Sequence, residues 1–287
     1  MKLLRFGQPG QERPGVVDSQ GNIRDLSGII SDLAGQVLHP ESLQQLAELD
    51  VESLPLVTQP VRLGPCVAKV GKMIAIGLNY ADHAAETGSR VPRQPIMFMK
   101  ATSAICGPND NVVQPLNSTK LDWEVELAVV IGRGGAYIDE ADAGQHIAGY
   151  CICNDVSERA FQLEMGGQWT KGKGCDTFGP LGPWLVTPDE IADVLDLTLE
   201  LRVNERIYQH SSTKNMLFSP AFLVSYVSQF MSLQAGDVIC TGTPAGVGMA
   251  QDPPVFLQAG DQIRLSVSGL GEQRQTVVSY QAQAHLG

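Results

Sequence analysis

The chain has 287 residues, 43% of them hydrophobic, which is enough to bury a full core in one large domain with a small appendage. Its formal net charge of -11 and pI near 4.9 argue against nucleic acid or anionic membranes as partners, because both call for a basic surface. The six cysteines are scattered without a CxxC pair, and the first residues lack the long apolar run of a targeting segment. We therefore expect a cytoplasmic protein with reduced thiols.

The first 65 residues predict a small N-terminal lobe of mixed α and β structure, followed by a connector. Short strands joined by turns are expected at Lys2–Phe6, Pro14–Val17 and Ile23–Leu26. Ser27 can cap a short helix that runs to about Ala34, and Pro40–Leu49 is typical of a second helix. Prolines recur at positions 55, 60 and 65, which favours an extended connector because proline cannot continue a helix. We place the domain boundary after residue 65.

Residues 66–287 predict a larger domain in which short apolar segments are separated by glycine and proline. Strands are expected at Ile74–Leu78, Ile96–Lys100, Val112–Val113, Glu124–Ile131, Ile147–Asn154, Leu197–Val203, Val238–Thr241, Gln262–Val267 and Thr276–Tyr280. Helices are expected at Tyr80–Glu86, Asp139–Ala143, Ser157–Leu163 and Pro220–Phe230. The expected fold class is β-rich α+β. The sequence contains neither a GxGxxG pattern nor a phosphate-binding loop, so nucleotide binding is not expected.

Two acids, Glu124 and Glu126, stand at the start of one of these strands. Alternate side chains of a strand share a face, so both carboxylates project together, about 6.5–7 Å apart along the backbone. The run Leu127–Ile131 is continuously apolar, which is typical of a strand buried on both faces. Buried carboxylates are costly unless they are paired or bind a cation, and no Lys or Arg lies inside the run. The pair therefore indicates a divalent metal site; the alternative is an edge strand whose solvent face carries two acids.

A third acid, Asp155, follows the apolar strand Ile147–Asn154. An acid at the end of a buried strand could supply another metal ligand, although it could equally cap the segment that follows. Three carboxylates suit Mg²⁺, with Mn²⁺ as a substitute, because hard cations favour oxygen ligands. Since the set contains no Cys or His, zinc is not expected.

His83 and Glu86 lie three residues apart in the short predicted helix Tyr80–Glu86. Residues at this spacing share a helix face, so the carboxylate can orient the imidazole and raise its basicity. The pair is a candidate general-base dyad, and an ordinary surface ion pair is the alternative.

Two glycine-rich segments could complete a site. Trp169–Pro183 is expected to be an ordered loop, from which a lysine could meet a developing enolate oxygen, although a solvated lysine is the commoner outcome. Thr241–Gly248 follows a strand and could offer backbone N–H groups and a hydroxyl to a substrate carboxylate, or could be only a turn.

Together these stretches resemble the fumarylacetoacetate hydrolase family. The resemblance follows the family order over roughly residues 70–270 and rests on Ile76–Tyr80 with His83 and Glu86, Asp122–Leu127, Asn154–Arg159, Lys173–Pro183 and Thr241–Gly248. It implies a mixed β-sandwich or roll, usually assembled as a homodimer or higher homo-oligomer. It also implies a Mg²⁺-dependent active site for small 2-oxo or 2,4-dioxo acids.

The resemblance also implies a role for each matching residue. Glu124, Glu126 and Asp155 would hold the metal, His83 and Glu86 would form the acid/base dyad, Lys173 would face the reacting oxygen, and Arg159, Gln162 and Thr243 would bind substrate. Lys173 is preferred over Lys171 because it stands three residues before Asp176, as the family pattern requires. Cys175 replaces an aromatic residue often found there.

Within the family, residues 1–7 and 167–173 look most like bacterial hydrolases of 2,4-diketo-3-deoxy-fuconate or rhamnonate. These enzymes split C3–C4 of the diketo acid to give pyruvate and lactate. Four alternatives stay open: oxaloacetate decarboxylase or acylpyruvase activity, a decarboxylase/isomerase of aromatic catabolism, a ureidoglycolate-type lyase, and a non-catalytic binding relative.

Overall fold

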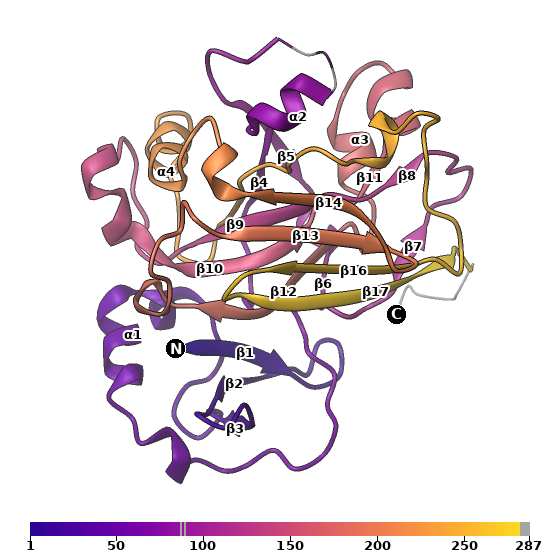
Figure 1. Cartoon of the computed structure of the whole chain (residues 1–287). Helices are drawn as coiled ribbons and strands as arrows, with labels where there is room; N and C mark the ends of the chain where they lie inside the picture. Colours follow the sequence, from indigo (N-terminus) through magenta and orange to yellow (C-terminus); the bar gives the residue numbers. More distant parts are fainter. Residues whose placement is uncertain (87, 89, 282–287) are drawn as a thin grey trace.

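The centre of the structure, a computed structural model that describes residues 1–86, 88 and 90–281, is a large mixed sheet (Figure 1). The described residues give it ten strands in the order β3-β2-β1-β12-β10-β9-β15-β4-β5, with β6 paired to β12. Its strands are β1 (Lys2–Phe6), β2 (Arg13–Val17), β3 (Ile23–Asp25), β4 (Met73–Gly77), β5 (Ile96–Lys100), β6 (Ile105–Cys106), β9 (Val125–Ile131), β10 (Ile147–Asn154), β12 (Gly179–Val186) and β15 (Val238–Cys240).

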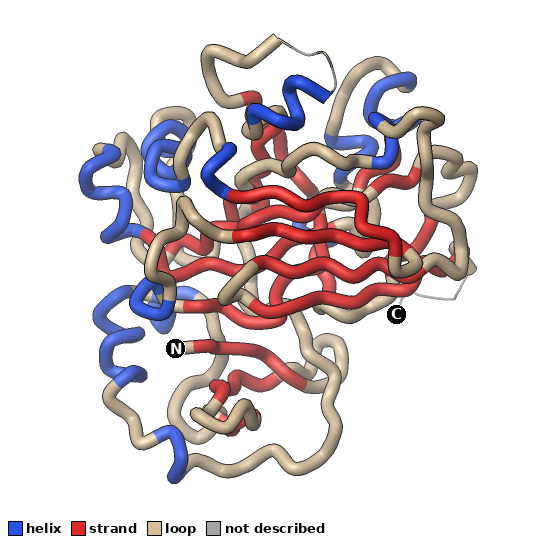
Figure 2. The backbone as a smooth tube through the Cα atoms, viewed as in Figure 1, coloured by secondary structure: helices blue, strands red, loops and turns tan. Residues whose placement is uncertain are grey.

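A second sheet packs against this one, and helices lie at the periphery (Figure 2). It has the order β14-β13-β16-β17-β7, and its strands are β7 (Val112–Gln114), β13 (Thr198–Val203), β14 (Arg206–Ser212), β16 (Gln262–Val267) and β17 (Gly271–Ser279). A short ribbon pairs β8 (Leu121–Asp122) with β11 (Ser157–Glu158). The β-rich α+β class is confirmed, with the fold of the structures compared below.

The α-helices are α1 (Pro40–Ala47), α2 (Ala81–Glu86), α3 (Thr170–Lys173) and α4 (Pro220–Ser228), and a π-helix spans Ala160–Glu164. Short 3-10 helices span Gly35–Leu38, Val51–Ser53, Thr102–Ala104, Glu140–His146, Pro188–Glu190, Thr213–Asn215 and Gly248–Ala250. Helices α2 and α3 lie at the same end of the molecule (Figure 1). None of the helices in the described part of the chain has the length and apolar character needed to cross a membrane.

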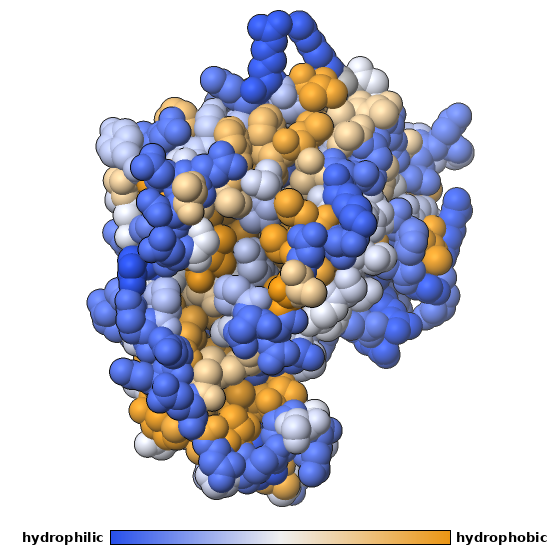
Figure 3. Space-filling model, turned by 60° about the vertical axis from the view of Figure 1, so that its left-hand side comes forward, coloured by the Kyte–Doolittle hydropathy of each residue, from blue (hydrophilic) through white to orange (hydrophobic). Residues whose placement is uncertain are grey.

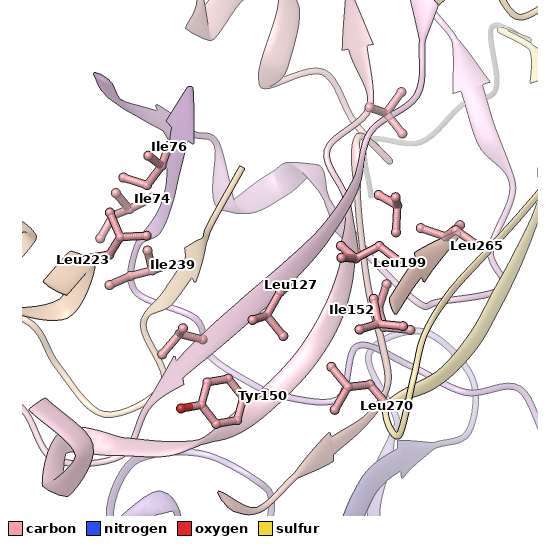
Figure 4. Packing of buried hydrophobic residues seen from close by; sticks show 14 of the residues in the cluster. Ile74, Ile76, Leu127, Tyr150, Ile152, Leu199, Leu223, Ile239, Leu265 and Leu270 are labelled. Carbon is pink, nitrogen blue, oxygen red and sulfur yellow. The ribbon is translucent and has the colours of Figure 1, made fainter. Parts of the chain in front are cut away.

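Strand β9 is buried on both faces, as its apolar run predicts. Leu127 and its alternate neighbours pack toward the second sheet, in a core that includes Ile152, Leu199 and Leu265 (Figure 4). Ala128 and Val130 face the opposite way, into a core shared with the N-terminal lobe. Burying a side chain of the Leu, Ile or Val type contributes about 1.5–3 kcal/mol, so β9 stabilises both layers of the fold.

The N-terminal lobe continues the large sheet, because β1 pairs antiparallel with β12 and places Lys2 opposite Val186. Arg62, in the connector, donates two hydrogen bonds to Asp110 at 2.7 and 2.5 Å.

Figure 3 shows apolar residues at the lower end of the molecule, where this lobe lies. Two large apolar side chains of the lobe, Ile29 and Leu56, are exposed. The division after residue 65 stays a prediction.

The helix predicted from Ser27 to Ala34 is wrong. Instead, the N–H groups of Ile29 and Ile30 both donate to the carbonyl of Leu26 in a single turn. The hydroxyl of Ser27 donates to Asp25 Oδ1 at 2.6 Å, and this contact holds the turn in place of a helix cap.

Two other local predictions are also wrong. The expected helix Ser157–Leu163 begins as strand β11 and becomes helical only from Ala160, because Ser157 and Glu158 pair with β8. The expected loop Trp169–Pro183 contains helix α3 and the start of strand β12. Pro183 is tolerated there because it lies in a bulge where the β10–β12 register shifts.

Candidate active site

Three buried carboxylates meet where β9 and β10 lie side by side. The register places Cys153 opposite Glu126, and the N–H of Asp155 donates to the carbonyl of Glu124 at 2.9 Å. Side chains two residues apart share a face, so Glu124, Glu126 and Asp155 all point to one side of the sheet. Each offers an oxygen, and these atoms lie within 4.8 Å of one another. The grouping expected from the sequence is therefore present.

Buried cations surround this group of acids. Lys173 Nζ donates to Glu124 Oε2 at 2.8 Å and to Asp155 Oδ2 at 2.9 Å. Arg159 donates to the other oxygen of Glu124 at 2.7 Å. Lys100, which is 2% exposed, donates to the other oxygen of Asp155 at 2.5 Å. Both oxygens of Glu124 and of Asp155 are thus hydrogen-bonded to positive charges.

The electrostatic environment of Glu126 differs from that of the other two acids. Burial disfavours the ionised form of Glu124, but Lys173 and Arg159 outweigh burial and lower the pKa of Glu124 to about 2. Burial raises the pKa of Glu126 well above its usual value, and the negative charges of Asp155 and Glu124 raise it further. Glu126 therefore lies where additional positive charge would be most stabilising.

The donor set fits a hard divalent cation. All three ligand candidates offer carboxylate oxygens, and the backbone N–H of Gly242 holds Glu126 by donating to Oε2 at 2.9 Å. A divalent ion would compensate the carboxylate that the neighbouring cations leave unbalanced.

Helix α2 brings the His83–Glu86 pair to the same place. His83 Nδ1 lies 3.3 Å from Glu86 Oε2, and the N–H of Gly246 donates to Glu86 Oε1 at 2.9 Å. Asp82 on the same helix accepts a hydrogen bond from the hydroxyl of Ser211 at 2.5 Å, which ties α2 to β14. The carboxylate of Glu86 is thus fixed, and it orients a His83 side chain that is 10% exposed.

The three residues expected to bind substrate line the same cavity but are already engaged. Arg159 donates to Asp122, Glu124 and, at 3.0 Å, Gln162 Oε1. The hydroxyl of Thr243 donates to the carbonyl of Val125 at 2.9 Å and accepts from Gln209 at 2.8 Å. Their roles in substrate binding stay predictions.

The cavity has a volume of about 270 Å³ and collects most of the predicted residues. It is lined by His83, Glu124, Glu126, Arg159, Gln162, Lys173 and Thr243, together with Ile76, Gly77, Leu78, Phe98, Leu163, Trp169 and Met249. Asp155 and Glu86 lie behind this lining, against Lys173 and His83. Lys171, the second candidate lysine, donates instead to the carbonyl of Met165 at the surface.

Sequence reasoning missed two buried polar residues of this site. Lys100 is the last residue of the apolar strand β5, and a lysine at such a position is normally solvated. The only sequence signal that could have found it is the apolar run before it, which includes Ile96 and Phe98. Asp122 is fully buried and accepts from Arg159 at 2.8 Å and from the N–H of Gly248 at 2.7 Å. It stands two residues before Glu124, in the stretch that the sequence singles out.

Comparison with known proteins gives the family. The family model described as "Fumarylacetoacetate (FAA) hydrolase C-terminal" matches residues 72–278. A Burkholderia multivorans relative, named only provisionally as a hydrolase and with no substrate, is 58% identical over 276 residues, which are 96% of this chain and 98% of the relative. The structure of a fumarylacetoacetate hydrolase from Exiguobacterium antarcticum is 38% identical, with a TM-score of 0.84, over 98% of this chain and 100% of that chain.

A maleylpyruvate hydrolase from Sphingobium sp. SYK-6, solved with manganese(II) and pyruvate, is 30% identical to this chain. The match has a TM-score of 0.81 and covers 98% of this chain and 100% of that one. Solved relatives include both hydrolases and isomerases. With a matching family model over most of its length and a buried acidic triad in place, the chain belongs to the fumarylacetoacetate hydrolase family.

Proposed function

We propose that the protein is a Mg²⁺-dependent hydrolase that splits the C3–C4 bond of a 2,4-dioxo acid, giving pyruvate and a second carboxylic acid. One observation carries the proposal: Glu124, Glu126 and Lys173 line the same cavity as His83, with Asp155 and Glu86 directly behind them. The carboxylates suit a metal, the lysine suits an oxyanion, and the dyad suits an attacking water.

Glu124, Glu126 and Asp155 would hold the metal, and Mg²⁺ is proposed because the donors are all carboxylate oxygens. When bound, the ion would supply Lewis-acid polarisation of the 2-oxo acid. The manganese and pyruvate found with the maleylpyruvate hydrolase support a divalent ion and a 2-oxo acid as partners of such a site.

His83 would act as the general base. Its Nδ1 faces Glu86, so a proton on that nitrogen is held by the carboxylate and Nε2 is the atom that would take a proton from water. The water oxygen then bonds to C4, and the C3–C4 bond breaks with its electron pair left on the pyruvate fragment. Protonation at C3 gives pyruvate, and C4 leaves as a carboxylic acid.

Lys173 would stabilise the oxygen that becomes negative during cleavage. Its side chain is 2% exposed and its ammonium group already spans Glu124 and Asp155, so it is fixed in place before substrate binds. A charge fixed in a site that excludes water stabilises a developing anion more strongly than one in solvent.

The second candidate function is a reaction that leaves a similar anion. It is either loss of CO₂ from oxaloacetate or tautomerisation of an unsaturated 2-oxo acid. Isomerases among the solved relatives favour keeping it. Decarboxylation uses neither an attacking water nor a general base, so the fixed His83–Glu86 pair favours hydrolysis over it, whereas tautomerisation would use the pair to move a proton.

The test is pyruvate release, coupled to lactate dehydrogenase, from acylpyruvates, 2,4-diketo-3-deoxy-rhamnonate and -fuconate, and oxaloacetate, with Mg²⁺ or with EDTA. Release from 2,4-dioxo acids that EDTA abolishes supports the proposal. Release confined to oxaloacetate would move the assignment to decarboxylase, and no release from any substrate with metal bound would reject hydrolysis.

A further inference from the structure

We infer that the substituent on C4 of the substrate is apolar and flat rather than hydroxylated. This inference rests on the proposed function, which supplies the dioxo-acid head, and it assigns the chemistry of the other end of the substrate. The sequence predicts a sugar-acid tail at this point, and the lining of the cavity favours a different one.

The cavity lining divides into a polar group and an apolar group. The polar group surrounds the carboxylates, as described above. The remaining side chains of the lining are apolar apart from the indole N–H of Trp169: Ile76, Leu78, Phe98, Leu163, Trp169 and Met249. The tail of 2,4-diketo-3-deoxy-fuconate or -rhamnonate carries a hydroxyl on C5, and placing it here would remove its hydrogen bonds to water without replacement.

Several of the polar residues in the lining are already hydrogen-bonded within the protein. Three nitrogens of Arg159 already donate within the protein, and Lys173 is bonded to two carboxylates. The hydroxyl of Thr243 both donates and accepts. These groups suit the charged head of the substrate, and they would have to break internal bonds to bind a hydroxyl of the tail.

Phe98 and Trp169 form an aromatic wall of the cavity, which begins beside Lys173. Lys173 Nζ lies 5.3 Å from the centre of the Phe98 ring, and Phe98 meets Trp169 edge to face, with centroids 5.3 Å apart. Trp169 packs directly on Gly77, where an added Cβ would lie 2.6 Å from its Cζ3. A flat apolar substituent on C4 would lie along this wall in the manner that aromatic faces favour.

Leu78 indicates that the apolar surface is functional. Its φ is +53°, in the left-handed region where a leucine is strained and a glycine is not. The next residue holds that backbone in place, because Asn79 donates to the carbonyls of Thr241 and Phe218 at 2.7 and 3.0 Å. A strained leucine that lines a cavity supplies a surface that glycine would lack.

The experiment compares kcat/KM for acylpyruvates with methyl, ethyl, propyl, pentyl and phenyl groups on C4 with that for 2,4-diketo-3-deoxy-rhamnonate, whose two-carbon tail matches ethyl, all with Mg²⁺. Each added methylene should raise kcat/KM by about fourfold until the cavity is full. The hydroxylated substrate should be at least about tenfold poorer than the alkyl substrate of equal length. An equal or better hydroxylated substrate would overturn the inference while supporting the hydrolase.

A binding measurement separates failure of the inference from failure of the proposed function. Calorimetric titration of the Mg²⁺-loaded protein uses 2-oxo acids that carry the same tails but have no C4 carbonyl to cleave. Tighter binding of the apolar tails, with no turnover of any dioxo acid, would reject the hydrolase and keep the tail preference. No preference between matched tails would reject the inference.

Two variants test the assignment of the wall. Leu78→Gly relieves the strained backbone, so it should fold, and it should lower the pentyl-to-methyl ratio of kcat/KM by at least about fivefold. Leu163→Gln, at a position 45% exposed, should shift preference toward the hydroxylated substrate. Leu116→Gly, an exposed leucine outside the cavity lining, is the control and should leave both ratios unchanged. Unchanged ratios in both cavity variants would contradict the assignment.

Discussion

Lys100 donates to Asp155 Oδ1 at 2.5 Å, with both side chains at most 1% exposed, so a candidate metal ligand is bound to a lysine that no water reaches. The same ammonium group donates to the carbonyl of Val156 at 3.3 Å. Lys100 therefore connects the end of β5 to the end of β10, and its charge is part of the framework of the site.

Replacing Lys100 with Met should destabilise the metal-free protein by about 1–3 kcal/mol, because it leaves Asp155 Oδ1 buried without a donor while Lys173 still bonds Oδ2. Urea unfolding measures the change. The control is Lys120→Met, which breaks an exposed pair with Glu164 and should cost less than about 1 kcal/mol. Equal losses in the two variants would show that burial of the Lys100–Asp155 pair has no energetic consequence.

Lys173→Met should lower kcat by about 10²–10³-fold, the effect typical of removing one group that stabilises an oxyanion. Steady-state pyruvate release measures it. Lys171→Met is the matched control, since Lys171 bonds the carbonyl of Met165 at the surface and should retain nearly normal kcat. A larger loss in the Lys171 variant would reverse the assignment of the two lysines.

Glu126→Gln should stabilise the metal-free protein at pH 8 and weaken metal binding. The folded state raises the pKa of Glu126, so the unfolded chain ionises this acid first, and stability is lost as pH rises above about 4.5. The thermal advantage of the variant over wild type, measured in EDTA, should therefore grow from pH 5 to pH 8. Calorimetry with Mn²⁺ should show at least about tenfold weaker binding.

Glu48→Gln, at an exposed acid of the N-terminal lobe, is the control for that comparison and should change neither property. If Glu126→Gln bound Mn²⁺ as tightly as wild type, Glu126 would leave the ligand set.

Asp18→Asn should destabilise the N-terminal lobe only above acidic pH. Burial opposes ionisation of Asp18, but hydrogen bonds from Arg24 and Asn22 outweigh it and lower the pKa of Asp18 from 3.8 to about 2. A lowered pKa stabilises the fold above the unfolded value of 3.8, and this contribution is lost as pH falls toward 2.

The difference in melting temperature between wild type and Asp18→Asn should thus be full at pH 6 and should shrink between pH 4 and pH 2. Asp139→Asn, at an exposed acid, gives the baseline. A difference that stays constant over this range would mean that Asp18 acts through its shape rather than its charge.

The parts of the site that the sequence predicts are those set by local periodicity. Alternation along one strand is enough to place Glu124 and Glu126 together, and a three-residue helical spacing is enough to place His83 beside Glu86. The family resemblance adds Asp155 and Lys173, which come from other elements.

The sequence does not predict features that depend on contacts between distant elements. Lys100 becomes part of the site only because β5 ends beside β10. The aromatic wall likewise joins Phe98 and Trp169, which packs on Gly77, and these three residues come from different segments of the chain. Strand β14 is missed for a local reason, because the turn before it has two residues at positive φ, Asn204 and Glu205, and lacks the usual glycine.

The pairing of β1 with β12 has a consequence for any shortened form of the protein. Removing residues 1–65 would expose β12 as an edge strand, with unpaired N–H and C=O groups beside the apolar core in which Leu3 packs with Leu181 and Leu185. Unprotected edges of this kind invite pairing with other chains and aggregation. The small lobe therefore protects the large sheet from self-association, and the two parts are best expressed as one piece.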